Sequence, residues 1–257
     1  MQITFIGAGS AFNKADGQTN LILTADSGKR MLIDCGNYCP QALRDMGVRE
    51  KDYATYFDAL YISHQHADHI GGLEELAFCT FFNPHKPKSL DLYCVDQLIS
   101  GLWANSLSGG LDSIEGRLMH LTDYFTCHPL NVNAGFTWEN IRCQTVQTVH
   151  VMGGFRIVPS YGLLLQEEAG PTIFLTTDTQ FCPHQISKFY DQADLIFHDC
   201  ETAMFRSGVH AHYDDLCSLP EAVRRKMWLC HYQEGPTQQP ITDGFAGFVA
   251  KGQTFDF

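Results

Sequence analysis

The sequence predicts an α+β fold in which two β-sheets pack face to face and helices cover their outer faces. Short runs rich in Ile, Val, Phe, Tyr and Thr recur between turn-forming residues, in two clusters that span roughly the first 95 and the last 120 residues. Helix-like segments lie between these runs. The chain shows no internal repeat, low-complexity tract or long linker, so we expect one domain over residues 1–257.

Each expected strand is a β-type run bounded by Gly, Asn, Asp or Pro. In chain order the strands are Gln2–Ile6, Leu21–Ala25, Arg30–Asp34, Ala59–Ser63, Leu90–Val95, Ile141–Val151, Tyr161–Glu167, Thr172–Thr176, Asp194–His198 and Lys226–His231. Gly170–Pro171 indicates a hairpin turn between two of them. Helix-like segments are expected at Pro40–Met46, Ile70–Phe78, Asp96–Leu107, Leu111–Phe125 and Glu221–Lys226.

Composition excludes several classes of protein. The 17 Lys and Arg against 29 Asp and Glu give a net charge of −12, which repels polyphosphates and disfavours tight binding of long nucleic acid. There is no run of 18 apolar residues, so we expect no membrane span, and MQITFIGAGSAFNK does not resemble a secretory signal. The 10 Cys form no C-x-x-C pair, and several lie in apolar runs. Reduced thiols, and therefore a cytoplasmic protein, are expected.

Four residues of metal-binding type cluster in the segment YISHQHADHIGGL. His64, His66, Asp68 and His69 follow an apolar strand and precede a helix. Residues i and i+2 at a strand end project the same way, so His64 and His66 can share one cation. Asp68 and His69, at the start of the helix, can take a second. Four solvated polar residues in a loop would be the alternative, and we favour metal.

Further ligands are available at the ends of other expected strands. His150 closes the run Ile141–Val151, Asp178 ends TIFLTTD and His231 ends MWLCH. A single histidine at a strand end is more often structural than a ligand. A sandwich, however, gathers its strand ends around one rim, so these three residues are candidates to complete two coordination shells.

These motifs resemble the metallo-β-lactamase fold superfamily and, within it, the ribonuclease Z-like phosphodiesterase branch. The similarity runs from residue 2 to about 232, through TFIGAGSAF, LIDCG, HQHADH, the SYG after His150, TTDT and LCHY. It implies an αββα sandwich of two mixed sheets with helices on the outer faces. It also implies that one divalent cation is held by His64, His66 and His150, a second by Asp68, His69 and His231, and that Asp178 bridges them.

Other positions match the branch less closely. The resemblance implies that Asp34 orients a ligand histidine from behind the cations. In FHDCET and VHAHYDDL, His210 matches the catalytic histidine of the branch and Asp199 stands where the branch has glutamate. Departures from the branch pattern leave two roles open. His198 either makes a structural hydrogen bond or is functional, and His212 is either a substrate contact or a surface residue.

The resemblance implies a two-metal phosphodiesterase. Zn²⁺ suits imidazole and carboxylate ligands, with Mn²⁺ as the alternative. A metal-bridging hydroxide would attack phosphorus in line, with Asp68 holding or accepting its proton. His210 would protonate the leaving ribose oxygen or contact the phosphate.

Chain length between two of these motifs bears on the substrate. The resemblance places the RNA-gripping arm of tRNA 3′-processing enzymes between the positions of His150 and Asp178. Only 28 residues separate the two here, and two strands and a hairpin turn account for them, so no such arm fits. Together with the acidic charge, this favours a small phosphodiester.

Within the branch, the short interval, the DCET…VHAHYDDL block and the tail GFAGFVAKGQTF are most similar to the anti-Pycsar cyclic-nucleotide phosphodiesterases. That likeness implies hydrolysis of 3′,5′-cyclic mononucleotides, pyrimidine ones included, to 5′-monophosphates. It also implies a homodimer in the cytoplasm of a bacterium or of a phage's host. The alternatives are a tRNA 3′-processing endonuclease, a thioesterase-type hydrolase of the same fold, and a protein that sequesters nucleotides. Residues 108–140 show no clear periodicity and suggest no function.

Overall fold

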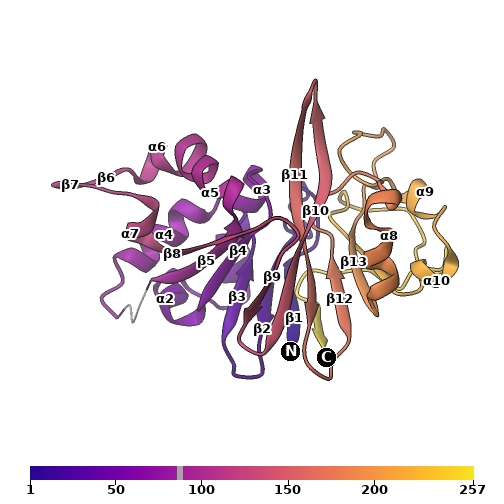
Figure 1. Cartoon of the computed structure of the whole chain (residues 1–257), viewed down its shortest axis with the longest axis horizontal. Coiled ribbons are helices and arrows are strands. Elements are labelled where there is room, and N and C mark those ends of the chain that lie inside the picture. The colour runs from indigo at the N-terminus through magenta and orange to yellow at the C-terminus, as the bar shows by residue number, and fades with distance from the viewer. Residues whose placement is uncertain (86–88) are drawn as a thin grey trace.

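The first of two β-sheets is built mainly from the N-terminal half of the chain. The computed structural model describes residues 1–85 and 89–257 (Figure 1). Over that part of the chain the sheet has seven strands in the order β16-β1-β2-β3-β4-β5-β8. Their bounds are β1 (Gln2–Gly7), β2 (Asn20–Thr24), β3 (Arg30–Ile33), β4 (Ala59–Ile62), β5 (Leu90–Val95), β8 (Phe125–Leu130) and β16 (Thr254–Asp256).

The second sheet also has seven described strands, in the order β15-β14-β13-β12-β11-β10-β9. Their bounds are β9 (Gly135–Trp138), β10 (Ile141–Gly153), β11 (Arg156–Gln166), β12 (Thr172–Leu175), β13 (Leu195–Asp199), β14 (Met227–Cys230) and β15 (Gly247–Phe248). Both sheets are mixed, because β3-β4-β5-β8 and β12-β13-β14-β15 pair in parallel and the other strands pair antiparallel. The β10–β11 hairpin rises above the rest of the molecule in Figure 1.

Helices flank each sheet on its outer side (Figure 1). On the side of the first sheet they are α1 (Cys39–Asp45), η1 (Glu50–Asp52), α2 (Tyr53–Tyr56), α3 (Ala67–Ile70), α4 (Leu73–Phe81), α5 (Asp96–Leu102), η2 (Trp103–Leu107), α6 (Ser108–Leu111) and α7 (Leu121–Tyr124). On the side of the second they are α8 (Pro183–Gln192), α9 (Tyr213–Leu216) and α10 (Glu221–Arg224). A small ribbon, β6 (Ser113–Ile114) and β7 (Arg117–Leu118), completes the elements.

Three layers of buried apolar side chains hold this arrangement together. Phe5, Tyr61 and Phe197 belong to the layer between the sheets. A second layer lies between the first sheet and its helices, and a third packs Phe189 of α8 against the second sheet. All four residues of β4 are buried, as expected for a parallel strand that is covered on both faces. The αββα sandwich predicted from the sequence is therefore confirmed.

Several local predictions were wrong. The segment 111–125 is not one helix, because it contains β6, β7 and only the single turn α7. Sequence order does not divide the sheets cleanly either, since the C-terminal strand β16 pairs with β1. Strands β8, β9, β15 and β16, helices α2, α8 and α9 and the turn η1 were not expected. Over the described residues, no helix has the length and hydropathy that a membrane span requires. That residues 1–257 form one domain stays a prediction.

Candidate metal centre

The turn after β4 directs the first group of predicted ligands. The strand ends at Ile62, the backbone is extended at His66, and α3 begins at Ala67. His64 and His66 therefore leave the strand end together, whereas Asp68 and His69 lie in the first turn of the helix. His64, Asp68 and His69 are buried, and His66 is exposed.

Left-handed backbone conformations shape three other strand ends. Asp34 after β3, Thr177 after β12 and His231 after β14 have φ values of 61°, 53° and 63°. Apart from Gly, Asn and Asp, residues adopt this region rarely, so Thr177 and His231 carry backbone strain of the kind that is common at functional sites. Two of these turns contain a predicted site residue, Asp34 or His231, and the third directly precedes Asp178. At all three places the chain therefore leaves the direction of its strand where a site residue stands.

His150 reaches the same place in a different way. It does not close its strand as predicted, because β10 continues to Gly153. Instead, the pairing of β10 with β11 shifts register between Val149 and Val151, so His150 lies in a β-bulge. A bulge re-aims a side chain locally, and His150 is buried as a result.

The structure brings the predicted ligands together in two groups that share one residue. His64, His66, His150 and Asp178 form the first group, and Asp68, His69, Asp178 and His231 form the second. In each group the ligand atoms lie within 4.8 Å of one another. These are the two sets that the family resemblance implied, although their roles as ligands stay a prediction.

Asp178 divides its two carboxylate oxygens between the groups. Its Oδ2 lies 3.7 Å from His64 Nε2 and 3.6 Å from His150 Nε2. Its Oδ1 lies 3.3 Å from His69 Nε2 and 3.4 Å from His231 Nδ1. One carboxylate thus faces both groups from a position between them.

Donor atoms in the second group have no partner within the described protein. His69 Nε2 and His231 Nδ1 are buried without a hydrogen bond. Orphaned buried nitrogens are costly, and here both point at carboxylate oxygens. Imidazole nitrogens and carboxylate oxygens are ligands that Zn²⁺ and Mn²⁺ accept. The residues present therefore fit divalent metal ions.

The protonation states suit such ligands. Burial lowers the pKa of His64 well below its ordinary value and lowers the pKa of His150 and of His231 to about 4, so these rings are neutral near pH 7. Burial alone would raise the pKa of Asp178, but the adjacent histidines hold it well below the usual range. These three rings thus offer neutral nitrogens around an ionised carboxylate. At His69 burial alone would lower the pKa, but the carboxylates of Asp178, Asp68 and Asp34 raise it well above its ordinary value, so a cation at this ring has to displace a proton from Nε2.

A layer of hydrogen bonds holds the ligands from behind. Asp34 Oδ2 lies 2.7 Å from His69 Nδ1, and both its oxygens accept bonds from Ser63, from the backbone N–H at 2.8 Å and from Oγ at 2.7 Å. His150 Nδ1 lies 2.9 Å from the Val209 carbonyl oxygen. The resemblance implied that Asp34 orients a ligand histidine, and His69 is the histidine that it contacts, although the role itself stays a prediction. Sequence reasoning missed Ser63, whose only signal is its place directly before His64.

Asp199 and His210 form a pair at the edge of the centre. Asp199 Oδ2 lies 2.7 Å from His210 Nδ1, which in turn lies 4.0 Å from Asp178 Oδ2. Burial raises the pKa of Asp199 to about 7. Burial alone would lower the pKa of His210, but the Asp199 carboxylate raises it to about 10. The pair therefore keeps a proton at neutral pH, next to the metal-binding groups.

The two histidines with open roles make structural contacts. His198 is fully buried, with Nε2 2.6 Å from the Tyr190 hydroxyl and Nδ1 2.7 Å from the Asp199 carbonyl oxygen. His212 is the N-cap of α9, where its side chain accepts a bond from the Asp214 backbone N–H. It is buried, so of the two alternatives left open for His212 the surface residue is wrong.

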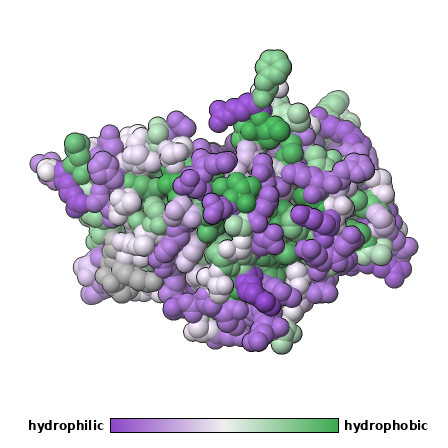
Figure 2. Space-filling view, in the orientation of Figure 1, coloured by the Kyte–Doolittle hydropathy of each residue, from purple (hydrophilic) through white to green (hydrophobic). Residues whose placement is uncertain are grey.

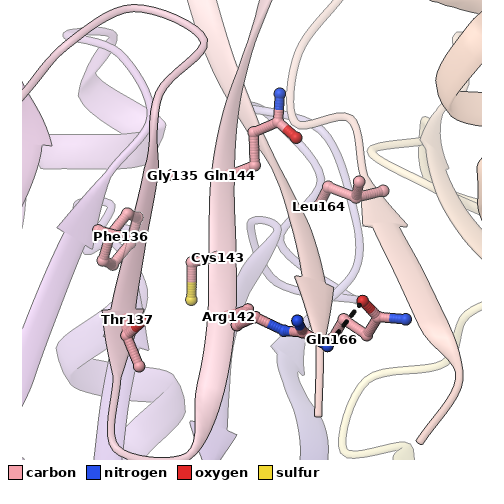
Figure 3. A pocket seen from close by; sticks show the side chains of 8 residues that line it. All are labelled: Gly135, Phe136, Thr137, Arg142, Cys143, Gln144, Leu164 and Gln166. Carbon is pink, nitrogen blue, oxygen red and sulfur yellow. Dashed lines mark hydrogen bonds between the residues drawn. The ribbon is translucent and has the colours of Figure 1, made fainter. Parts of the chain in front are cut away.

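A hollow of about 360 Å³ lies away from this centre, on the open face of β9, β10 and β11 (Figure 3). Arg142, Gln144 and Gln166 line it together with Phe136, and Arg142 donates a hydrogen bond of 3.4 Å to Gln166. None of the predicted site residues reaches this hollow. The chemistry is therefore concentrated where the strand ends meet.

Fold and site together define a metallo-β-lactamase fold protein. The structure is similar to a metallo-β-lactamase fold protein, YhfI from Bacillus subtilis, with a TM-score of 0.74 and 17% identity over 99% of this chain and 98% of that one. The profile of the family described as anti-Pycsar protein Apyc1 matches residues 1–255. Two members are similar along their whole length: one from Bacillus phage vB_BveM-Goe7 is 35% identical, covering 98% of this chain and 96% of its own. The other, from Paenibacillus xerothermodurans, is 33% identical, with 100% and 98% covered. The chain belongs to the anti-Pycsar Apyc1 family.

Proposed function

We propose that the chain is a two-metal phosphodiesterase that hydrolyses 3′,5′-cyclic mononucleotides, pyrimidine ones included, to 5′-monophosphates. The proposal is carried by the position of the Asp178 carboxylate, which directs one oxygen to each of the two ligand groups. Family membership supports a phosphodiesterase-type role, since the relatives are named for opposing Pycsar.

The residues of the centre divide the work of such a reaction. Divalent cations bound there, Zn²⁺ or alternatively Mn²⁺, would supply an activated water and neutralise charge on the phosphoryl oxygens. His210 carries a proton at neutral pH because Asp199 holds it charged, so it can donate that proton to the leaving ribose oxygen. Burial alone would raise the pKa of Asp68, but its histidine neighbours lower it to about 2, so the carboxylate stays ionised as a ligand and can hold the proton of a bound water in a hydrogen bond.

The size of the substrate follows from the connections around the centre. Between His150 and Asp178 the chain completes the β10–β11 hairpin, β11 and β12, which leaves no separate arm that could grip an RNA. The net charge of −12 weakens binding of long nucleic acid as well. Both features support a small phosphodiester over tRNA.

A turnover assay on metal-loaded protein tests the proposal. The panel holds the 3′,5′-cyclic mononucleotides of four bases, bis-p-nitrophenyl phosphate and a 3′-extended tRNA. Asp178→Asn is the test variant and Asp191→Asn, an exposed carboxylate on α8, is the matched control.

We expect the wild type and the control to cleave the cyclic nucleotides. The turnover rate of Asp178→Asn should fall by more than the roughly 10–100-fold that is lost when a residue behind the metal ligands is changed. Cleavage of tRNA alone, or turnover of a thioester with none of the panel cleaved, would overturn the substrate class.

We also propose that the chain forms a homodimer, as the family resemblance implies. Exposed apolar side chains near the tip of the projecting β10–β11 hairpin, Met152 and Phe155, support a protein contact there (Figure 2). Light scattering coupled to size exclusion measures the mass directly. A mass of 28.9 kDa at micromolar concentration would contradict the proposal.

A further inference from the structure

A second cavity, of about 430 Å³, lies between helix α5 and the upper part of β11. Its volume falls in the range of small-molecule sites. Its polar lining residues include Gln65, Gln97, Asn105, Arg156 and Tyr161. None of them belongs to the metal-binding groups, and the catalytic roles proposed above do not use them.

The cavity borders the first ligand group. Gln65 stands between His64 and His66 in the chain. Pro159, another lining residue, pairs across the ladder with Val149, directly before His150. A molecule whose phosphate lies at the metal centre can therefore extend into this cavity.

Hydrogen-bonding capacity in the cavity is unused. Gln65 Nε2 donates to the Leu98 carbonyl at 2.8 Å, which leaves its Oε1 without a partner among the described residues. Gln97 Oε1 accepts a hydrogen bond from the Tyr161 hydroxyl at 3.4 Å, and the NH₂ group of Gln97 has no partner among the described residues. The exposed Asn105 makes no side-chain bond with the described protein.

This set of groups matches the edge of a nucleobase. A side-chain amide presents one acceptor and one donor group side by side, the pattern by which Asn and Gln recognise bases. Leu98, Ile157 and Val158 add apolar surface for the faces of a ring. Arg156 has no ion pair with the described residues, and guanidinium planes stack on bases.

We propose that this cavity binds the base of the substrate, with Gln97 and Asn105 bonding to its edge and Arg156 lying against its ring. The proposal rests on the proposed function, whose substrate it makes specific: a base-bearing phosphodiester, recognised in part by its base. A site of three long, exposed side chains would accept several bases and favour those with matching edges.

The test compares Gln97→Leu and Asn105→Leu with a matched control, Gln192→Leu, an exposed amide on α8 outside the cavity. The substrates are the four 3′,5′-cyclic mononucleotides and bis-p-nitrophenyl phosphate, which has no base edge. Calorimetric titration with the four nucleoside 5′-monophosphates measures binding apart from turnover, and thermal melting confirms that each variant is folded.

We expect KM for the cyclic nucleotides to rise about 2–12-fold per variant, the range of one hydrogen bond, and unequally among the bases. Affinity for the 5′-monophosphates should fall in parallel, with turnover of bis-p-nitrophenyl phosphate and all values for the control unchanged. Equal losses on bis-p-nitrophenyl phosphate, or unchanged KM and affinity for every base, would overturn the base site. If the wild type cleaves bis-p-nitrophenyl phosphate but no cyclic nucleotide, the proposed substrate fails, whereas the 5′-monophosphate titrations still decide whether the cavity binds a base.

Discussion

Replacing Asp34 by Asn tests how the residues behind the metal centre control it. Asp34 is buried and accepts bonds from Ser63, while its Oδ2 lies 2.7 Å from His69 Nδ1. A carboxylate can only accept, so when a cation displaces the Nε2 proton of His69, the remaining proton stays on Nδ1. The other nitrogen, Nε2, then keeps its lone pair toward Asp68 and Asp178, each 3.3 Å away.

Asn has the same shape but carries an NH₂ group on one arm. The Ser63 backbone N–H holds the amide oxygen on the Oδ1 side, so the NH₂ group faces His69 Nδ1. His69 then accepts a bond at Nδ1 and carries its proton on Nε2, the atom that a cation needs. Loss of such an outer partner costs about 10–100-fold in metal affinity, and the wrong tautomer places Asp34→Asn near 100-fold, or about 2.7 kcal/mol.

Calorimetric titration of metal-free protein with Zn²⁺ and with Mn²⁺ measures this loss. Asp91→Asn is the control, because Asp91 Oδ1 lies 2.9 Å from His128 Nε2 in a similar pair away from the centre. We expect wild-type affinity in the control and weakened binding in Asp34→Asn. An Asp34→Asn protein that is folded and binds the same number of cations with unchanged affinity would refute the tautomer argument.

Two further predictions concern the proton donor and the packing under the centre. In Asp199→Asn, His210 loses the carboxylate that holds its pKa near 10, so the rate that needs a protonated His210 should begin to fall about 1–3 pH units lower than in the wild type. A pH–rate profile with an unmoved basic limb would contradict this. In Gly36→Ala the new Cβ would lie 2.0 Å from the Asp68 carbonyl oxygen, so chemical denaturation should show a loss of about 1–3 kcal/mol in the free energy of unfolding. Gly109→Ala, on α6 with no atom within 4 Å of the added Cβ, is the control, and equal losses in both would refute the steric reason.

The strands that the sequence predicted are those with a strong local signal. All ten expected runs overlap an observed strand, because buried strands of this fold are dense in branched and aromatic residues. The missed strands β8, β9 and β16 carry weaker signals. FTCHPL contains a proline, GFTW is short, and β16 exists through its pairing with β1, which is about 250 residues away in sequence. Tertiary pairing, which no local pattern encodes, determines these edges.

The candidate site divides along the same line. Residue types and short spacings predicted the cluster His64–His69 and offered His150, Asp178 and His231 as candidates. The division into two sets, and the pair Asp199 and His210, came from the family resemblance. The bulge at His150, the carbonyl of Val209 behind it and the capping role of His212 were beyond reach. Each depends on a contact between segments that are distant in sequence, so it becomes visible only when the strands are in register.

The left-handed turns after β3, β12 and β14 are held in place by the sheets that carry them. Thr177 and His231 each hold a conformation that costs of order 1–3 kcal/mol, whereas Asp34 is of a residue type that tolerates it better. Asp34 and His231 directly follow β3 and β14, and Thr177 is the second residue after β12. Such strain persists only where the surroundings over-determine the backbone, and here β3, β12 and β14 pair with neighbours on both sides. The free energy of packing in the sandwich therefore offsets the backbone strain of these turns, and the turns direct the site residues away from the strand direction. Because both sheets contribute turns, the centre is positioned by the packing of one sheet on the other.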